Sequence, residues 1–180
     1  MSNAYSELVA RISGGEGLTR DEVQSLLSTE DGQDFALIEA ASALRRQEFR
    51  NVIAIHTEDE ELAEALGTRS ISIDSYEILD ISQDIDSHEL ADRMVALGAG
   101  KSTGITVKLP QQAVPMTLMR ILSVLRLAAP DKVIHLPEGY EESLRSLASL
   151  AMHIVSAITI TDDIEPVSYT HLTLPTSDLV

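Results

Sequence analysis

The feature that most constrains the fold is a repeated alternation of strands and helices in residues 105–160. Residues 105–109 predict a short apolar strand, and residues 115–134 predict a helix that turns into a second strand. Residues 141–160 predict one more helix and strand. Parallel strands need helical crossovers of this kind, so the alternation predicts a parallel α/β architecture.

The preceding residues extend the pattern. Helices are expected at residues 4–12, 20–27 and 33–49. Thr19 and Glu22 form a capping box at the start of the second helix, and Thr57 and Glu60 form another before a later helix. Strands are expected at residues 52–56 and within 70–81. The chain therefore predicts three helices and then five strands alternating with four helices, either as an open doubly wound sheet or as part of a barrel.

Residues 167–176 do not continue this pattern. This run resembles one reading frame of a common sequencing adapter, translated by accident. We expect residues 167–180 to be an artefactual tail and the natural protein to continue differently after Pro166. The alternative is a genuine Thr-rich strand.

Charge and cysteine content exclude several classes of protein. The net charge is -16, and a field of that sign repels phosphate backbones, so no nucleic-acid partner is expected. The chain has no cysteine, which excludes disulfides and Cys-ligated zinc or iron–sulfur sites within it. No apolar run approaches the ~20 residues of a membrane helix, and the N-terminus lacks the layout of a signal peptide. A cytoplasmic location without membrane contact is therefore expected.

Three histidines are candidate site residues because they lie at or beside expected strand ends. They are His56, His135 and His153. Strand ends are where parallel α/β folds build their sites. The three rings could converge on a metal ion or act with carboxylates in a non-radical enzyme. The alternative, which we favour, is three unrelated histidines.

Two further motifs carry weaker hypotheses. Residues 98–103 resemble a phosphate-binding loop, but Val95 replaces its first glycine, and a helix precedes the run where a strand is needed. His88 and Asp92 half resemble a zinc-protease helix, with Glu89 beside them and no third ligand marked. We favour a glycine helix stop for the first motif and an ordinary acid-rich first turn for the second.

Two groups of charged residues are expected to face solvent. Residues 58–92 hold twelve acidic residues and one basic residue, Arg69, and could bind a cation or a basic partner. Arg120 and Arg126 share a narrow polar stripe with Thr117 and Ser123 on an otherwise apolar helix. The favoured interpretation of the stripe is the solvent face of a packed helix.

Several segments, in order, resemble the biotin synthase group of radical SAM enzymes, especially methylornithine synthase and the related hydrogenase maturase. The matching segments are residues 18–27, 40–51, 109–111, 115–116, 121–127, 130–131, 134 and 151–158. The resemblance covers both ends of the chain. It implies a partial (β/α) TIM-type barrel with about five parallel strands in residues 51–166, after a helical lead-in over residues 1–50.

The chain departs from this group where the chemistry would lie. The group places a Cys-x3-Cys-x2-Cys loop for an iron–sulfur cluster after the lead-in, whereas this chain has residues 52–59 there and no cysteine. Much of the group's mid-barrel is missing. No residue for the cluster, for S-adenosylmethionine or for a substrate can therefore be carried over, and no cofactor is predicted.

Three functions remain open from the sequence. The first is a non-catalytic companion that pairs with a radical SAM enzyme, or with itself, in cofactor or amino-acid biosynthesis. A partial barrel exposes strand edges, which favours such a partner. The second is a small-molecule-binding α/β module. The third is a non-radical enzyme that uses the strand-end histidines.

Overall fold

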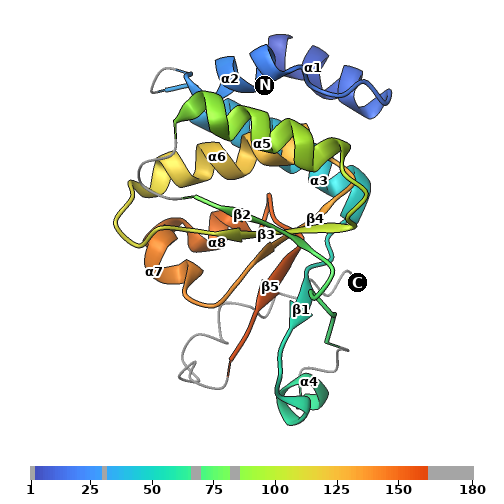
Figure 1. Ribbon diagram of the computed structural model, residues 1–180, viewed down its shortest axis with the longest axis vertical. Helices are drawn as coiled ribbons and strands as arrows, with labels where there is room; N and C mark the ends of the chain where they lie inside the picture. The colour runs from blue at the N-terminus through green and yellow to red at the C-terminus, as the bar shows by residue number, and fades with distance from the viewer. Residues whose placement is uncertain (1–2, 30–31, 66–69, 82–85, 162–180) are drawn as a thin grey trace, which may run out of the picture.

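Five parallel strands form a single sheet in the part of the chain that the structure describes (Figure 1). They are β1 (Ala54–His56), β2 (Glu77–Asp80), β3 (Gly104–Lys108), β4 (Val133–Leu136) and β5 (Ala157–Thr159). The computed structural model describes residues 3–29, 32–65, 70–81 and 86–161. The expected tail, residues 167–180, lies outside these ranges, as does Arg69.

The strand order identifies the sheet as a partial barrel. The order is β1-β5-β4-β3-β2, so four consecutive strands are neighbours and the first strand pairs with the last. In a closed (β/α) barrel the first strand pairs with the last strand and also with the second strand. The opening therefore falls between β1 and β2. The architecture is that of a partial (β/α) barrel, one of the two predicted from the alternation.

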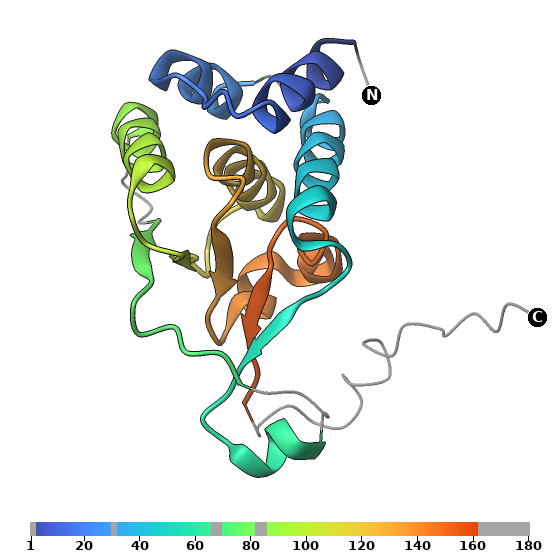
Figure 2. The ribbon, with the colours of Figure 1, turned by 90° about the vertical axis from the view of Figure 1, so that its right-hand side faces the viewer.

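Eight α-helices accompany this sheet in the described ranges. They are α1 (Asn3–Ser13), α2 (Arg20–Leu27), α3 (Asp34–Phe49), α4 (Glu60–Ala65), α5 (Ser87–Ala99), α6 (Pro115–Ala128), α7 (Tyr140–Leu144) and α8 (Ala148–Ala151), with a 3₁₀ turn at Arg145–Leu147. Helix α6 lies between α3 and α5 and packs against both, and α1 and α2 form a further layer over them (Figures 1 and 2). No helix of the described chain is long and apolar enough to cross a bilayer.

The two faces of the sheet differ in chemistry because side chains alternate along each strand. One face is aliphatic and joins the helices in a single buried core; its members include Leu79, Ile105, Val107, Ile134, Leu136 and Ile158. The other face carries polar residues, among them Thr106, which pairs with His135 in register. In a complete barrel this second face would line the interior.

Local signals account for some boundaries and fail at others. The capping box of Thr19 and Glu22 is confirmed. The second box is wrong, because Asp59 accepts from the backbone N–H groups of Glu61 and Leu62 and thereby starts α4 two residues later than the box requires. The extended run at residues 70–74 is not a strand of the sheet. It lies along β1, where the N–H of Ile71 donates to the carbonyl of Ile55.

The expected solvent exposure of the polar stripe of α6 is correct for Thr117, which is exposed, and wrong for Ser123 and Arg126, which are buried. Arg126 is 0% exposed, and Ser123 is equally buried. Arg120 forms a two-pronged ion pair with Asp34 at the start of α3, with N–O distances of 2.6 and 3.0 Å. Helix α3 therefore covers the stripe from Arg120 onward, and the polar groups there find partners inside the protein.

Arg126 binds neutral acceptors. It donates to the carbonyls of Ile154, Pro130 and Lys132 and to the hydroxyl of Ser156, at 2.8–3.2 Å. The ring of Phe49 lies 4.9 Å from the guanidinium. Burial, with the nearby charge of Arg45, lowers the pKa of Arg126 to about 9, so the group keeps its proton at pH 7.

A second buried arginine holds the same end of the sheet. Arg45 of α3 donates to the carbonyls of Val155, Arg50 and Val52. Burial lowers its pKa from the usual value. Arg45 and Arg126 thus bind adjacent carbonyls just before β5, at the amino ends of the strands. In barrels this end serves stability, and the opposite end carries the site.

Replacing Gly98 by alanine tests the contact between α5 and α6. A Cβ at Gly98 would lie 2.2 Å from the carbonyl oxygen of Ala128, which is backbone and cannot rotate away. Gly98→Ala should lower the free energy of unfolding by about 2 kcal/mol, because the overlap outweighs the ~1 kcal/mol that alanine gains in a helix. Denaturant titration measures the change. Gly17→Ala is the control, since no atom lies within 4 Å of its Cβ, and a stabilised Gly98→Ala would refute the contact.

Candidate functional site

A chain of hydrogen bonds crosses the polar face of the sheet and is centred on His135 of β4. Nδ1 of His135 lies 3.1 Å from the hydroxyl of Thr106 on β3, and Nε2 lies 2.9 Å from the hydroxyl of Thr159 on β5. Threonine hydroxyls both donate and accept, so they satisfy a neutral imidazole in either tautomer. Three neighbouring strands are thereby joined through their side chains.

His135 is fully buried although it lies on the polar face. Its ring centroid is 6.0 Å from that of His56 and 6.4 Å from that of Tyr76. Burial, followed by the nearby charge of His56, lowers the pKa of His135 to about 4. His135 is therefore a neutral polar residue at pH 7 and organises the face.

Tyr76 belongs to a segment that spans the opening between β1 and β2. We call residues 70–76 the strap. At one end the hydroxyl of Ser70 donates to the carbonyl of Thr57, and at the other Ser102 donates to the carbonyl of Ser75. The Tyr76 ring lies against Gly104, where a Cβ would come within 2.6 Å of it. The strap thus brings an aromatic cover to His135.

His56, the last residue of β1, is held in one tautomer. Its Nδ1 lies 2.8 Å from the carbonyl oxygen of Ile71 in the strap. A carbonyl can only accept, so Nδ1 must donate, and the neutral ring then presents a lone pair on Nε2. Among the described residues, no hydrogen bond to this Nε2 is found. The arrangement leaves an acceptor for a bound molecule.

A cavity of about 810 Å³ lies beyond the carboxyl ends of β1, β4 and β5. His56 and Thr159 line it, together with Ile73 of the strap and Pro137 after β4. Its acidic members are Glu58, Asp59, Glu60, Glu61 and Glu138. A neighbouring hollow of about 290 Å³, lined by Lys108, Tyr140 and Ser143 among others, lies beyond β3 and β4. Both lie at the end of the sheet where parallel folds place their ligands.

The structure brings two of the three candidate histidines together. His56 and His135 share the polar face, whereas His153 is exposed in the turn before β5, at the amino ends of the strands. In the described chain no group of three or more His, Cys, Asp or Glu residues could hold a metal ion. Only the pair of His56 and His135 therefore belongs to one site.

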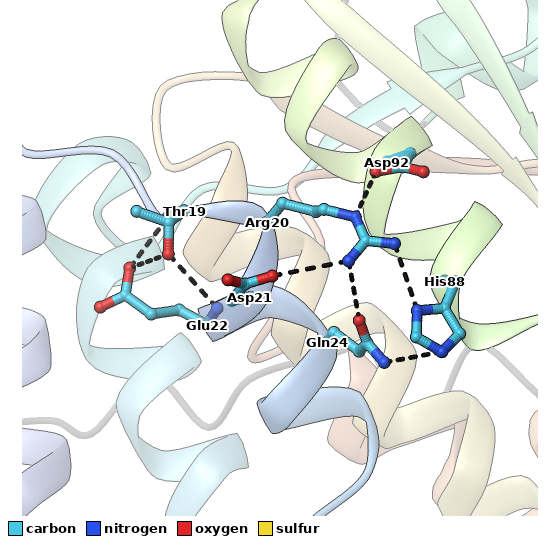
Figure 3. A network of polar contacts seen from close by, with 7 residues as sticks. All are labelled: Thr19, Arg20, Asp21, Glu22, Gln24, His88 and Asp92. Atoms are coloured by element: carbon cyan, nitrogen blue, oxygen red, sulfur yellow. Dashed lines mark hydrogen bonds and ion pairs between the residues drawn. The ribbon is translucent and has the colours of Figure 1, made fainter.

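His88 and Asp92 share one face of α5, as their spacing predicts, and that face contacts α2 (Figure 3). Arg20 donates to Asp92 at 2.7 Å and to Nδ1 of His88 at 3.2 Å. Gln24 lies 3.0 Å from the other ring nitrogen. This network joins the N-terminal helices to the barrel. The side chains of His88 and Asp92 are therefore part of a contact between two helices.

The two remaining motifs are the glycine-containing run at residues 98–103 and the acidic run at residues 58–92. Residues 98–103 begin in the last turn of α5 and lead into β3, which is the inverted order predicted for a run that is not a phosphate loop. The first part of the acidic run lines the large cavity, from Glu58 to Glu61. Residues 66–69 and 82–85 of that run lie outside the described residues.

Sequence reasoning missed Thr106, Thr159 and Tyr76. The first two are single polar residues inside apolar strands, Thr106 between Ile105 and Val107 and Thr159 between two isoleucines. That alternation could have marked them as facing away from the core. Tyr76 carries no such signal, because its position depends on the path of the strap.

Comparison with known proteins gives one partial match. The biotin synthase of Kocuria rhizophila is 41% identical to this chain over 51 residues. The match covers 28% of this chain and only 11% of that protein. No family model matches the chain. The match supports a radical SAM-related origin, in agreement with the resemblance in the sequence, and goes no further.

Proposed function

We propose that the chain binds a small polar organic molecule at the carboxyl ends of its strands. The observation that carries the proposal is the cavity of about 810 Å³ lined by His56 and Thr159. Its size is typical of small-molecule sites, and His56 offers it an oriented acceptor. The buried neutral His135 fixes the Thr159 hydroxyl beside that acceptor.

The proposed function does not use an iron–sulfur cluster. A radical SAM-related origin implies three thiolates after the first strand, and this chain continues there from His56 to Thr57, Glu58 and Asp59. None of its 180 residues is a cysteine. Since these residues do not fit the cluster, we assign no radical step and no S-adenosylmethionine chemistry to this chain.

A ligand screen by thermal denaturation tests the proposal. Amines, carboxylates, sugars, nucleosides and neutral amides are tested separately, and at least one class should raise the melting temperature in a concentration-dependent way. Thr159→Val should remove this shift, because it deletes a hydroxyl on the cavity wall. His153→Gln, on the exposed turn at the other end of the sheet, should keep it. A shift that survives Thr159→Val, or no shift in any class, contradicts the proposal.

A second candidate is a companion role, in which the chain pairs with a radical SAM enzyme or with a second copy of itself. The outer edge of β2 has no strand beside it in the described chain, and Ile78 on that strand is 60% exposed. Glu77 and Asp80 are the first and last residues of β2, and their acidic side chains oppose pairing of this edge with another strand. Co-elution with a biotin synthase-type enzyme would favour this candidate, and a monomer that elutes alone would count against it.

A further inference from the structure

We propose that the cavity beside His56 binds the ammonium end of a linear di- or polyamine that carries no carboxylate. This inference rests on the binding function proposed above and adds the chemical class of the ligand. It follows from the hydrogen-bonding state of the cavity wall, the charge around it and its size.

The wall at the end of β1 and β5 accepts hydrogen bonds. His56 must donate from Nδ1 to the carbonyl of Ile71, so the neutral ring offers Nε2 as an acceptor. His56 pairs with Thr159 in register, so the two side chains lie side by side at the strand ends. The hydroxyl oxygen of Thr159 keeps a lone pair while it bonds to His135. A ligand that donates hydrogen bonds satisfies both of these acceptors.

The charge of the lining selects a cation among possible donors. Glu58 follows β1 and Glu138 follows β4, so carboxylates flank the wall on two sides. Neither lysine nor arginine is among the described residues that line this cavity. A carboxylate or phosphate on the ligand would be repelled here, whereas an ammonium group would gain Coulomb energy and donate up to three hydrogen bonds.

The cavity also favours an extended organic cation over a metal ion. A metal ion needs several ligands in a fixed geometry, and the described residues contain no group of three that could supply them. An ammonium group needs only acceptors at hydrogen-bond distance. A volume of about 810 Å³ leaves room for an aliphatic chain, and Ile73 and Pro137 offer it apolar contacts.

Calorimetry on the whole chain tests the inference, with 1,5-diaminopentane and spermidine as probes. Titrations are made at about 0.15 M salt, which screens unspecific attraction to a protein of net charge -16. Both amines should bind at one site, and 1,5-pentanediol, glutarate and lysine should bind at least about tenfold more weakly. Their shared carbon chain makes the diol and the dicarboxylate matched controls for charge.

Variants locate the site. His56→Phe keeps a ring but removes the acceptor, and Glu58→Gln removes one exposed carboxylate with little risk to the fold. Each should weaken amine binding about tenfold. Glu7→Gln removes an exposed carboxylate from α1, which lies at the other end of the molecule from α4, and should leave binding unchanged (Figures 1 and 2).

The possible failures are distinguishable. If a neutral or anionic compound binds in a way that depends on Thr159 and the amines do not, this inference is overturned while the proposed function stands. If no compound of any class binds, both are overturned. If amines bind equally well to Glu58→Gln and to the wild type, the attraction is unspecific and the inference fails. The same holds if Glu7→Gln lowers the affinity for amines as much as Glu58→Gln does.

Discussion

Arg126→Met should lower the free energy of unfolding by about 3–5 kcal/mol, because it removes a buried cation from the acceptors around it. Methionine fills the space of the aliphatic stem but donates no hydrogen bond. Three carbonyls then lose this donor inside the protein, whereas the Ser156 hydroxyl oxygen still accepts from the N–H of Ile134. Those acceptors belong to the turn between α6 and β4 and to the residues just before β5, so the loss should loosen the amino ends of two central strands.

Denaturant titration of Arg126→Met and of a matched variant, Arg93→Met, measures this effect. Arg93 is exposed and pairs with Glu89 one helical turn away on α5. Pairs of this kind contribute about 0.3–0.5 kcal/mol, so Arg93→Met should stay close to the wild type. Equal stabilities of the two variants would mean that the guanidinium of Arg126 does not hold the strands together.

The error over Arg126 shows where helical periodicity stops being informative. The stripe of Arg120, Ser123 and Arg126 is the most polar face of α6, and the pattern identifies it correctly as different from the rest. Periodicity does not reveal what packs on that face. Helix α3 lies there and supplies Asp34 to Arg120, while main-chain carbonyls of later residues serve Arg126. Asp34 and Ile154 are distant in sequence and leave no local signal, and the nearer partners of Arg126 are main-chain carbonyls, which every residue carries.

The order of strands and helices was predictable, but the pairing of β1 was not. Short aliphatic runs mark the strands, and the helices between them require a parallel sheet. An open doubly wound sheet and a barrel fragment share that pattern. The pairing of Ala54 with Ala157 decides between them, and it joins residues at opposite ends of the domain.

The rule that sites lie at strand ends predicts only part of the candidate site. His56 and His135 were found because strand ends are where parallel folds place their sites. The same rule selects His153, but β5 begins only at Ala157, so His153 precedes the strand at its amino end. Chain direction already places His153 before the strand, so the rule excludes it once it is restricted to carboxyl ends.

His135 should make the protein less stable in mild acid. Its folded-state pKa is about 4, below the ordinary value of 6.5 that it regains on unfolding. Between these pH values the unfolded chain binds a proton that the folded protein does not. The free energy of unfolding therefore falls as the pH is lowered from about 6.5 to about 4. With allowance for solvent near the open face, this contribution should be about 2 kcal/mol.

Comparison of the wild type with His135→Gln separates the contribution of His135 from that of the carboxylates, because the carboxylates titrate in both proteins. Glutamine keeps a donor and an acceptor for Thr106 and Thr159 but cannot take up a proton. The stability of the wild type relative to His135→Gln, from denaturant titrations at several pH values, should drop by about 2 kcal/mol from pH 7 to pH 4. A difference that does not vary with pH would show that His135 titrates alike in both states.

Tyr76→Ala tests the physical cause, which is burial under the strap. Removing the phenol ring should admit water to His135 and raise its pKa from about 4 toward 6.5. Titration of the ring protons by NMR measures the pKa directly, and the other histidines of the same sample are internal references. The acid sensitivity should weaken in parallel, because both effects have one origin. If the pKa of His135 stays near 4 in Tyr76→Ala while the fold is intact, the shielding comes from the strands and His56, and the strap does not control the chemistry of the polar face.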